Sequence, residues 1–193
     1  MRRICVYCGS RPGRDPAFAA AARGLAGALA ERGLELVYGG GGTGLMGVLA
    51  TEALARGVRV TGVIPRALVA RELAHAGLDE LVLVDSMHER KARMEALSDG
   101  FVALPGGFGT ADETFEMLTW SQLGFHAKPV GLVDVRGFFA PLLAFVDHAT
   151  AAGFIDPAHR ALLVSEEDPS ALLARMVGPR ELAESACPGS SRP

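Results

Sequence analysis

The stretch from Pro105 to Glu113 is the part of the chain best suited to chemistry. It reads Pro-Gly-Gly-Phe-Gly-Thr-Ala-Asp-Glu and follows the apolar run 101–104. A strand that stops at Pro105 and continues as a helix leaves backbone N–H groups unpaired, and glycines let a ligand approach them closely. The pattern therefore predicts an anion-binding turn with carboxylates beside it. A tight connection between strand and helix, with no ligand, is the alternative.

A second glycine cluster, residues 39–44, follows the apolar run that ends at Tyr38. With Gly47 it superficially matches a dinucleotide-binding fingerprint. However, it follows the second expected strand, and no acidic residue ends the next one at 58–64. No Gly-Lys-Ser/Thr follows, as a nucleoside triphosphate loop would require. The cluster is therefore either a tight turn or part of a phosphate or ribose wall.

The segment 86–94 reads Ser-Met-His-Glu-Arg-Lys-Ala-Arg-Met and is dense in charge. A solvated helix face would explain such density. The segment begins directly after an expected strand, however, so Arg90 or Lys91 could turn into a crevice at that strand end. The planar guanidinium group of an arginine suits phosphate or carboxylate. His88 lacks the spacing of a zinc-binding histidine pair.

The carboxylates of Glu113 and Glu116 share one face of the helix expected after the turn. Two such groups could bind a divalent cation, but no third ligand is evident, so we expect no metal. Glu113 alone is better placed as a base, or as a stabiliser of positive charge developing on a sugar ring. Asp112 is expected to help start the helix. Cys5 and Cys8 are expected to be strand thiols, since neither lies at a helix start.

Strand-like and helical patterns alternate along the chain, which predicts an α/β domain with a parallel sheet covered by helices on both faces. A Rossmann-type doubly wound topology is the leading expectation, although the pattern leaves the strand order open. The expected strands are 3–8, 34–38, 58–64, 81–84, 100–104, 129–133 and 161–164, and the expected helices are 16–32, 45–55, 87–97, 109–123, 138–152 and 169–176. We expect a single domain over residues 1–178 and a mobile tail over 179–193.

Three segments fall at expected strand carboxyl ends: the turn after Leu104, the glycine cluster 39–44, and Cys8-Gly-Ser10. In open α/β sheets ligands bind outside these ends, near the point where strand order reverses. The three segments can therefore share one crevice. The irregular stretch 65–79 could also line it.

Composition limits the partners of the chain. Its 193 residues are 49% hydrophobic, with a formal net charge of −3 and a pI near 6.0. This balance gives no reason to expect a nucleic-acid partner. The apolar stretch near the amino terminus is too short for a signal peptide or a membrane span, and three cysteines argue against a secreted disulfide framework. A cytoplasmic protein without a membrane partner is expected.

Three segments taken together, 38–47, Met87-His-Glu-Arg-Lys91 and 105–113, resemble the "lonely guy" family, long labelled lysine decarboxylase-like. The resemblance runs from Cys5 to the strand at Pro129. Members of that family are Rossmann-type homodimers or larger assemblies. They hydrolyse cytokinin riboside 5′-monophosphates, and many also cleave AMP, releasing the free base and ribose 5-phosphate. The resemblance implies a hydrolase of a nucleoside 5′-monophosphate that forms a homodimer and needs no cofactor.

Carried over residue by residue, the resemblance assigns Arg90 and Glu113 as the catalytic pair. It places the phosphate over Gly107 to Thr110, with Lys91 close by. Arg90 could contact the base or orient Glu113, and the sequence leaves both roles open. The family resemblance and the predicted crevice at the strand ends together give the expected substrate-binding residues. They are Ser10, Gly41, Gly44, Glu72, Lys91, Gly106, Gly107, Phe108, Gly109, Thr110, Ala111, Asp112 and Thr119.

The chain departs from the family pattern at three positions. Arg11 follows Cys-Gly-Ser where the family often has a second serine, Ser86 stands where aspartate is frequent, and Phe108 replaces a common tyrosine. None of these removes a motif residue. Arg11 could alter how the mouth of the site meets phosphate or base.

Two other functions are compatible with parts of the pattern. Amino-acid decarboxylation with pyridoxal phosphate needs a lysine for the Schiff base, and the chain has only Lys91 and Lys128. A non-enzymatic carrier of a nucleotide or of the molybdenum cofactor would use the same turn for binding alone. Such a carrier would not need Glu113. Whether isopentenyl-type bases are preferred over adenine depends on pocket walls that the sequence does not identify.

Overall fold

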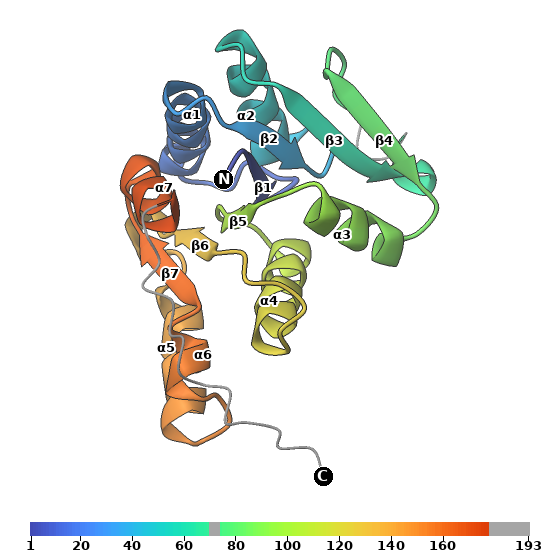
Figure 1. The fold of residues 1–193 in the computed structure, drawn as a ribbon. Helices are drawn as coiled ribbons and strands as arrows, with labels where there is room; N and C mark the ends of the chain where they lie inside the picture. Colours follow the sequence, from blue (N-terminus) through green and yellow to red (C-terminus); the bar gives the residue numbers. More distant parts are fainter. Residues whose placement is uncertain (70–73, 178–193) are drawn as a thin grey trace.

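One seven-stranded parallel sheet organises the computed structural model, which describes residues 1–69 and 74–177. Its strand order is β4-β3-β2-β1-β5-β6-β7, and every neighbouring pair is parallel (Figure 1). The strands are β1 (Arg3–Tyr7), β2 (Glu35–Tyr38), β3 (Val60–Pro65), β4 (Glu80–Val84), β5 (Gly100–Ala103), β6 (Val130–Val133) and β7 (Leu163–Glu166). The helices are α1 (Pro16–Glu31), α2 (Gly44–Ala55), α3 (Met87–Ala96), α4 (Phe108–Gln122), α5 (Ala140–Ala151), α6 (Pro157–Arg160) and α7 (Pro169–Val177), with 3-10 turns at Arg66–Leu68 and Val135–Gly137.

Helices cover both faces of the sheet, as Figure 1 shows. On one face α1, α2 and α7 bury residues such as Leu25, Leu49 and Leu172 in one core. On the other face α3 and α4 bury Met94 and Met117 in a second core. This arrangement confirms the expected Rossmann-type α/β domain. The order reverses at β1, which lies between β2 and β5, and the crevice rule therefore directs attention to the carboxyl ends of β1 and β5.

Of the strands that begin later than expected, β2 and β3 do so because the residue after a glycine closes the preceding helix. Leu34 donates its backbone N–H to Leu29 at 3.0 Å, and Val58 donates to Ala53 at 2.9 Å. Each bond satisfies a carbonyl group in the last turn of a helix, as in a Schellman motif. The apolar side chain at 34 or 58 resembles the start of a strand, although its backbone belongs to the helix cap.

The carboxyl-terminal elements differ from expectation in several places. The helix expected over 138–152 is α5 (Ala140–Ala151), which follows the 3-10 turn Val135–Gly137. The short helix α6, capped by Asp156, was not foreseen because four residues are too few for a periodic pattern. Ala161 is the C-cap residue of α6, so β7 runs over Leu163–Glu166 rather than over the expected 161–164. No helix within residues 1–69 and 74–177 has the length and apolar character needed to cross a membrane. The expected tail, 179–193, lies outside the described residues.

Candidate active site

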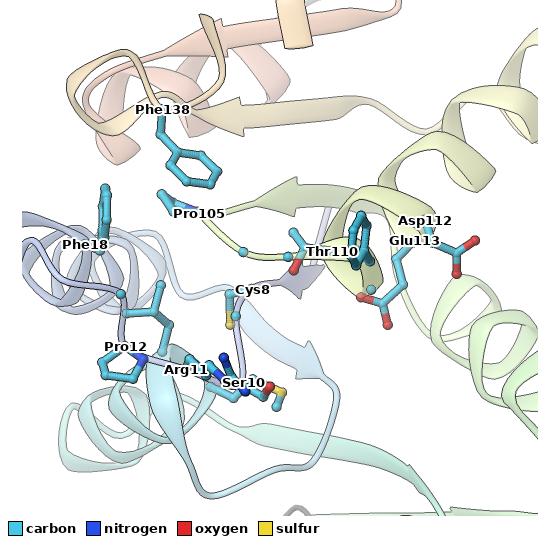
Figure 2. A pocket seen from close by; sticks show the side chains of 18 of the residues that line it. Cys8, Ser10, Arg11, Pro12, Phe18, Pro105, Thr110, Asp112, Glu113 and Phe138 are labelled. Carbon is cyan, nitrogen blue, oxygen red and sulfur yellow. The ribbon is translucent and has the colours of Figure 1, made fainter. Parts of the chain in front are cut away.

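A cavity of about 420 Å³ opens at the carboxyl ends of β1 and β5, where the crevice was expected. Its walls come from the loop after β1, the first turns of α4, and shorter stretches of α1, α2, α3 and the segment before α5. Figure 2 shows Glu113 and Asp112 toward one end, Phe18 and Phe138 toward the other, and Thr110 between them. The lining residues are Cys8, Gly9, Ser10, Arg11, Pro12, Gly13, Phe18, Leu45, Met46, Met87, Arg90, Pro105, Gly106, Gly107, Phe108, Gly109, Thr110, Asp112, Glu113 and Phe138.

A buried ion pair lies at one end of the cavity. Nη1 of Arg90 lies 3.3 Å from Oε1 of Glu113, and the two side chains are only 8% and 9% exposed. The other two nitrogens of Arg90 are also engaged: Nε donates to the carbonyl of Val63 at 3.1 Å, and Nη2 donates to the carbonyl of Gly39 at 3.3 Å. The guanidinium group thus holds the ends of β2 and β3 and the carboxylate of α4 in one arrangement.

Gly39 provides the space that this guanidinium group needs. A Cβ atom at position 39 would lie 2.2 Å from Nη2 of Arg90, far inside contact distance. The first glycine of the cluster therefore positions Arg90 and does not itself line the cavity. The sequence identified the cluster, but it could not reveal this role because Arg90 lies 51 positions along the chain.

The amino terminus of α4 forms the expected anion-binding turn. Gly107 is the residue before the helix, and it has no side chain that could accept from the N–H groups of the first turn. These groups, on residues 108–110, lie at the cavity wall. Gly9 N–H donates to the carbonyl of Pro105 at 3.1 Å, which ties the loop after β1 to this turn. Backbone N–H groups at a helix start favour an anionic guest.

The loop that carries Ser10 and Arg11 is held against the start of α2. The N–H of Leu45 donates to the carbonyl of Gly9 at 3.0 Å, and the Thr43 hydroxyl donates to the carbonyl of Ser10 at 3.3 Å. Gly44 has φ +60°, and a Cβ atom there would lie 2.3 Å from the backbone of Ser10. This close backbone contact fixes the path of the loop along the cavity.

Lys91 lies behind the cavity wall and is fully engaged with α4. Its Nζ lies 3.1 Å from a carboxylate oxygen of Asp112 and 3.1 Å from one of Glu116. Burial lowers the pKa of Lys91, but its hydrogen bonds to these carboxylates outweigh burial and raise the pKa above its ordinary value. Because α4 begins at Phe108, Asp112 lies in the second turn, so it pairs with Lys91 instead of starting the helix.

No group of three or more His, Cys, Asp or Glu side chains in residues 1–69 and 74–177 is arranged to hold a metal ion. The carboxylates of Asp112 and Glu116 converge on an ammonium group rather than on one another.

Cys5 and Cys8 are buried free thiols of the first strand and its end. Burial raises the pKa of both thiols. A reactive thiol needs a lowered pKa, so these two act as small apolar residues, as the sequence suggested.

The predicted site residues separate into three groups. Within the described residues, the cavity brings together the predicted pair Arg90 and Glu113 with seven predicted substrate-binding residues, namely Ser10, Gly106, Gly107, Phe108, Gly109, Thr110 and Asp112. Gly41, Gly44, Lys91, Ala111 and Thr119 do not line it. Glu72 lies outside the described residues.

Four of the five predicted residues that are described but do not line the cavity have a structural explanation or a different location. Gly41 forms an isolated bridge with Ala74, and Gly44 supports the Ser10 loop from behind. Lys91 is turned toward α4. Thr119 lies further along α4 and lines a separate cavity of about 260 Å³ between α4, α5, α6 and β7.

The apolar walls of the site were missed. Phe18 and Phe138 pack edge to face with ring centroids 5.6 Å apart, and Met46 and Met87 also line the cavity. Their types and spacing carry no chemical signal. Phe138 follows the carboxyl end of β6, however, so applying the crevice rule to every strand end would have included its loop. Arg11 was noticed as a departure but was not among the predicted site residues.

Comparisons with known proteins give a consistent result. Residues 46–176 match the family described as "Possible lysine decarboxylase". The probable cytokinin riboside 5′-monophosphate phosphoribohydrolase LOGL1 of Oryza sativa subsp. japonica is 51% identical over 174 residues, which cover 90% of this chain and 78% of that protein. The cytokinin riboside 5′-monophosphate phosphoribohydrolase LOG2 of Arabidopsis thaliana is 46% identical over 173 residues, covering 90% and 81%.

Solved structures also resemble the chain. The molybdenum cofactor carrier protein of Chlamydomonas reinhardtii superposes with a TM-score of 0.67 over 90% of this chain and 95% of that one, at 21% sequence identity. The molybdenum cofactor binding protein of Rippkaea orientalis superposes with a TM-score of 0.66 at 20% identity, over 90% and 94%. At these identities the likeness concerns the fold alone.

Proposed function

The chain belongs to the lonely guy (LOG) family of cytokinin riboside 5′-monophosphate phosphoribohydrolases, and on this premise we propose that it hydrolyses the N-glycosidic bond of such nucleotides, of AMP, or of both. The products are the free base and ribose 5-phosphate. One observation carries the proposal within this chain. The buried Glu113, paired with Arg90, lies one to two helical turns from the anion-binding start of α4, in the same cavity.

Glu113 is the proposed catalytic residue. Breaking the bond between C1′ and the base nitrogen builds positive, oxocarbenium-like charge on the ribose, which a nearby carboxylate stabilises. Water adds its oxygen to C1′, the bond to the base breaks, and the base leaves with a proton. Glu113 can also orient that water. Arg90 is the proposed positioning residue, because each of its nitrogens already has a protein partner, and one of these partners is Glu113.

The 5′-phosphate is proposed to bind over residues 107–110. Its distance from C1′ in a nucleotide is close to one helical turn, about 5 Å. A phosphate at the start of α4 would therefore bring the ribose to the level of Glu113. Binding energy from the phosphate then positions the sugar for attack.

Replacing Glu113 tests the proposal. Glu113→Gln keeps the size of the side chain and a hydrogen bond to Arg90 but removes the negative charge. We expect hydrolysis of AMP and of isopentenyladenosine 5′-monophosphate to fall by about a hundredfold or more, with nucleotide binding retained. Release of free base, followed by chromatography, measures the first quantity, and calorimetry measures the second.

Glu52→Gln is the matched control, because it alters a surface ion pair of α2 with Arg56. It should leave hydrolysis unchanged. Near-normal turnover by Glu113→Gln would remove this glutamate from the mechanism, and comparing the two substrates in the unaltered protein would establish the preferred base.

The alternatives have less support. A Schiff base would need a neutral lysine, whereas Lys91 is held by two carboxylates with a raised pKa and Lys128 pairs with Glu95. Neither lysine lines the cavity within the described residues. Carriage of the molybdenum cofactor is suggested only by shared fold, and pure binding gives no use for the buried Glu113.

We also propose that the protein forms a homodimer in the cytoplasm, without a cofactor. Leu123 and Phe125 follow the end of α4, Phe145 lies on α5 and Phe154 follows it, and all four are exposed, Phe125 and Phe154 to 73% and 87%. We propose that these four side chains form one apolar patch, since exposed apolar groups that cluster favour a protein partner. Thr119, a ligand contact by family resemblance, is in the same region. Pairing through the patch would allow it to reach the cavity of a second copy.

A further inference from the structure

The charges that line the cavity are few. Within the described residues they belong to Arg11, Arg90, Asp112 and Glu113, which together sum to zero. A nucleoside 5′-monophosphate adds a phosphate group with close to two negative charges at neutral pH. Backbone N–H groups carry only partial charge, so a full positive charge near the phosphate would add substantially to its binding.

Two of the nearby cations are already committed. Arg90 pairs with Glu113 and donates to two backbone carbonyls. Lys91 lies behind the wall between Asp112 and Glu116. Moving either cation to a phosphate would leave a buried or half-buried carboxylate without its partner, which is costly. Neither is therefore well suited to neutralise the ligand.

Arg11 differs from both. Its guanidinium group makes no hydrogen bond or ion pair with any other residue in 1–69 and 74–177, and its side chain is exposed. Its backbone is nevertheless closely held, since a Cβ atom at Gly44 would lie 2.4 Å from its nitrogen and one at Gly9 would lie 3.0 Å from its oxygen. A fixed backbone with an uncommitted cation is a suitable arrangement for meeting a charged ligand.

The position of Arg11 also fits. It lines the same cavity as residues 106–110. The hydrogen bond from Gly9 to Pro105 holds the two segments together. A phosphate placed over the start of α4 would therefore have backbone donors on one side and the loop of Arg11 on the other.

We propose that Arg11 is the cation that binds the 5′-phosphate, and that it makes this chain selective for nucleotides over nucleosides. The planar guanidinium group offers two parallel N–H donors to phosphate oxygens, which an ammonium group does not. The proposal rests on the proposed function for its substrate class. It concerns a position at which this chain departs from the serine that is frequent in its family.

Arg11→Ser and Arg11→Lys test the proposal in the full-length protein, with Arg14→Ser as the control. Arg14 is exposed on the same loop but does not line the cavity. We expect Arg11→Ser to raise KM for AMP about tenfold or more, with a much smaller effect on kcat, as for loss of a charged hydrogen bond. Arg11→Lys should lose less, and Arg14→Ser should match the unaltered protein. Added salt should raise KM more steeply in the unaltered protein than in Arg11→Ser.

Binding of ribose 5-phosphate, with ribose as the uncharged comparison, needs no turnover and separates this proposal from the proposed function. Arg11→Ser should weaken binding of ribose 5-phosphate about tenfold and leave that of ribose unchanged. Binding through Arg11 without hydrolysis of any nucleotide would overturn the proposed function alone. Equal KM and equal ribose 5-phosphate affinity in Arg11→Ser and Arg14→Ser would overturn the role of Arg11 alone. No binding of ribose 5-phosphate to the unaltered protein would also overturn it.

Discussion

At the scale of single residues, the partners of each cation determine what it can do. Arg90, Lys91 and Arg11 are all near the start of α4, yet of these three only Arg11 has a charged group that makes no hydrogen bond or ion pair with another described residue. Arg90 is suited to holding Glu113, and Lys91 is suited to joining α3 to α4. The difference comes from neighbours, because an arginine or a lysine carries the same charge wherever it lies.

Gly39→Ala tests the positioning of Arg90. The added Cβ would lie 2.2 Å from Nη2 of Arg90, so the guanidinium group must move. Its movement would also change the geometry of the ion pair with Glu113. A displacement of about 1 Å at a catalytic group can cost about a hundredfold in rate, and we expect a loss of that order in hydrolysis of AMP.

The control for Gly39→Ala is Gly24→Ala, in the interior of α1, where the nearest atom to the new Cβ is Cγ of Pro169 at 3.8 Å. This variant should keep full activity and gain about 0.5–1 kcal/mol in stability, because alanine is the better helix former. Full activity in Gly39→Ala with an intact fold would show that the position of Arg90 does not limit the reaction.

At the scale of elements, the site depends on how strand ends and helix starts meet. The loop after β1 is tied to the turn after β5 by the bond from Gly9 to Pro105, and to the start of α2 by the bond from Leu45 to Gly9. At the other end of the sheet, Glu35 of β2 accepts hydrogen bonds from Arg2 and Arg3. The carboxyl end of β1 is thus held by hydrogen bonds between backbone groups, whereas its amino end is held by bonds between charged side chains.

The Glu35 contacts predict a pH-dependent stability. Burial raises the pKa of Glu35, but the hydrogen bonds from Arg3 and Arg2 outweigh it, so the pKa lies below its usual value of 4.5. A carboxylate with a lower pKa in the folded state stabilises the fold above its unfolded pKa, and that contribution is lost as pH falls through the folded pKa. We expect Glu35→Gln to lower the free energy of unfolding by about 0.5–1 kcal/mol at pH 7.

Urea unfolding at pH 7 and at several values below 4.5 measures this difference. It should shrink steadily as the pH falls, since protonated Glu35 resembles glutamine. Glu31→Gln, on an exposed glutamate at the end of α1, should show no difference at any pH. A deficit in Glu35→Gln that stays constant with pH would point to packing rather than charge.

At the scale of the whole molecule, the candidate site and the apolar patch lie on different parts of α4. The first two turns of the helix face the cavity, whereas its end meets Leu123 and Phe125. Thr119 and the second cavity lie between these regions. A homodimer through the patch would explain both the exposed aromatic side chains and the position of Thr119 outside the cavity of its own chain.

Phe145→Asp tests the homodimer. Phe145 is 60% exposed on α5 and also lines the second cavity, so a charge there should weaken pairing with little effect on the fold of one chain. We expect sedimentation velocity to show a dimer for the unaltered protein and a monomer for this variant, with reduced hydrolysis of AMP. Phe145→Leu should remain a dimer. A monomeric unaltered protein with full activity would exclude this role for the patch.

The sequence by itself determined the fold class, the anion-binding turn and the two central residues of the candidate site. Alternating strand and helix patterns led to a parallel α/β fold, and the glycine-rich turn after Leu104 indicated an anion-binding helix start. Family resemblance named Arg90 and Glu113, which the structure joins in a buried pair. These features could be read from sequence because hydrophobic periodicity, capping residues and motif spacing are local properties of the chain.

Only the tertiary structure decided the rest. It placed β1 between β2 and β5, put Gly39 against Arg90, turned Lys91 toward α4, left Arg11 uncommitted at the cavity, and put Thr119 outside it. The physical reason is the same in each case. Strand order, close approach and charge pairing are contacts between segments that lie far apart along the chain, so they depend on side-chain directions in the folded molecule and not on any local pattern.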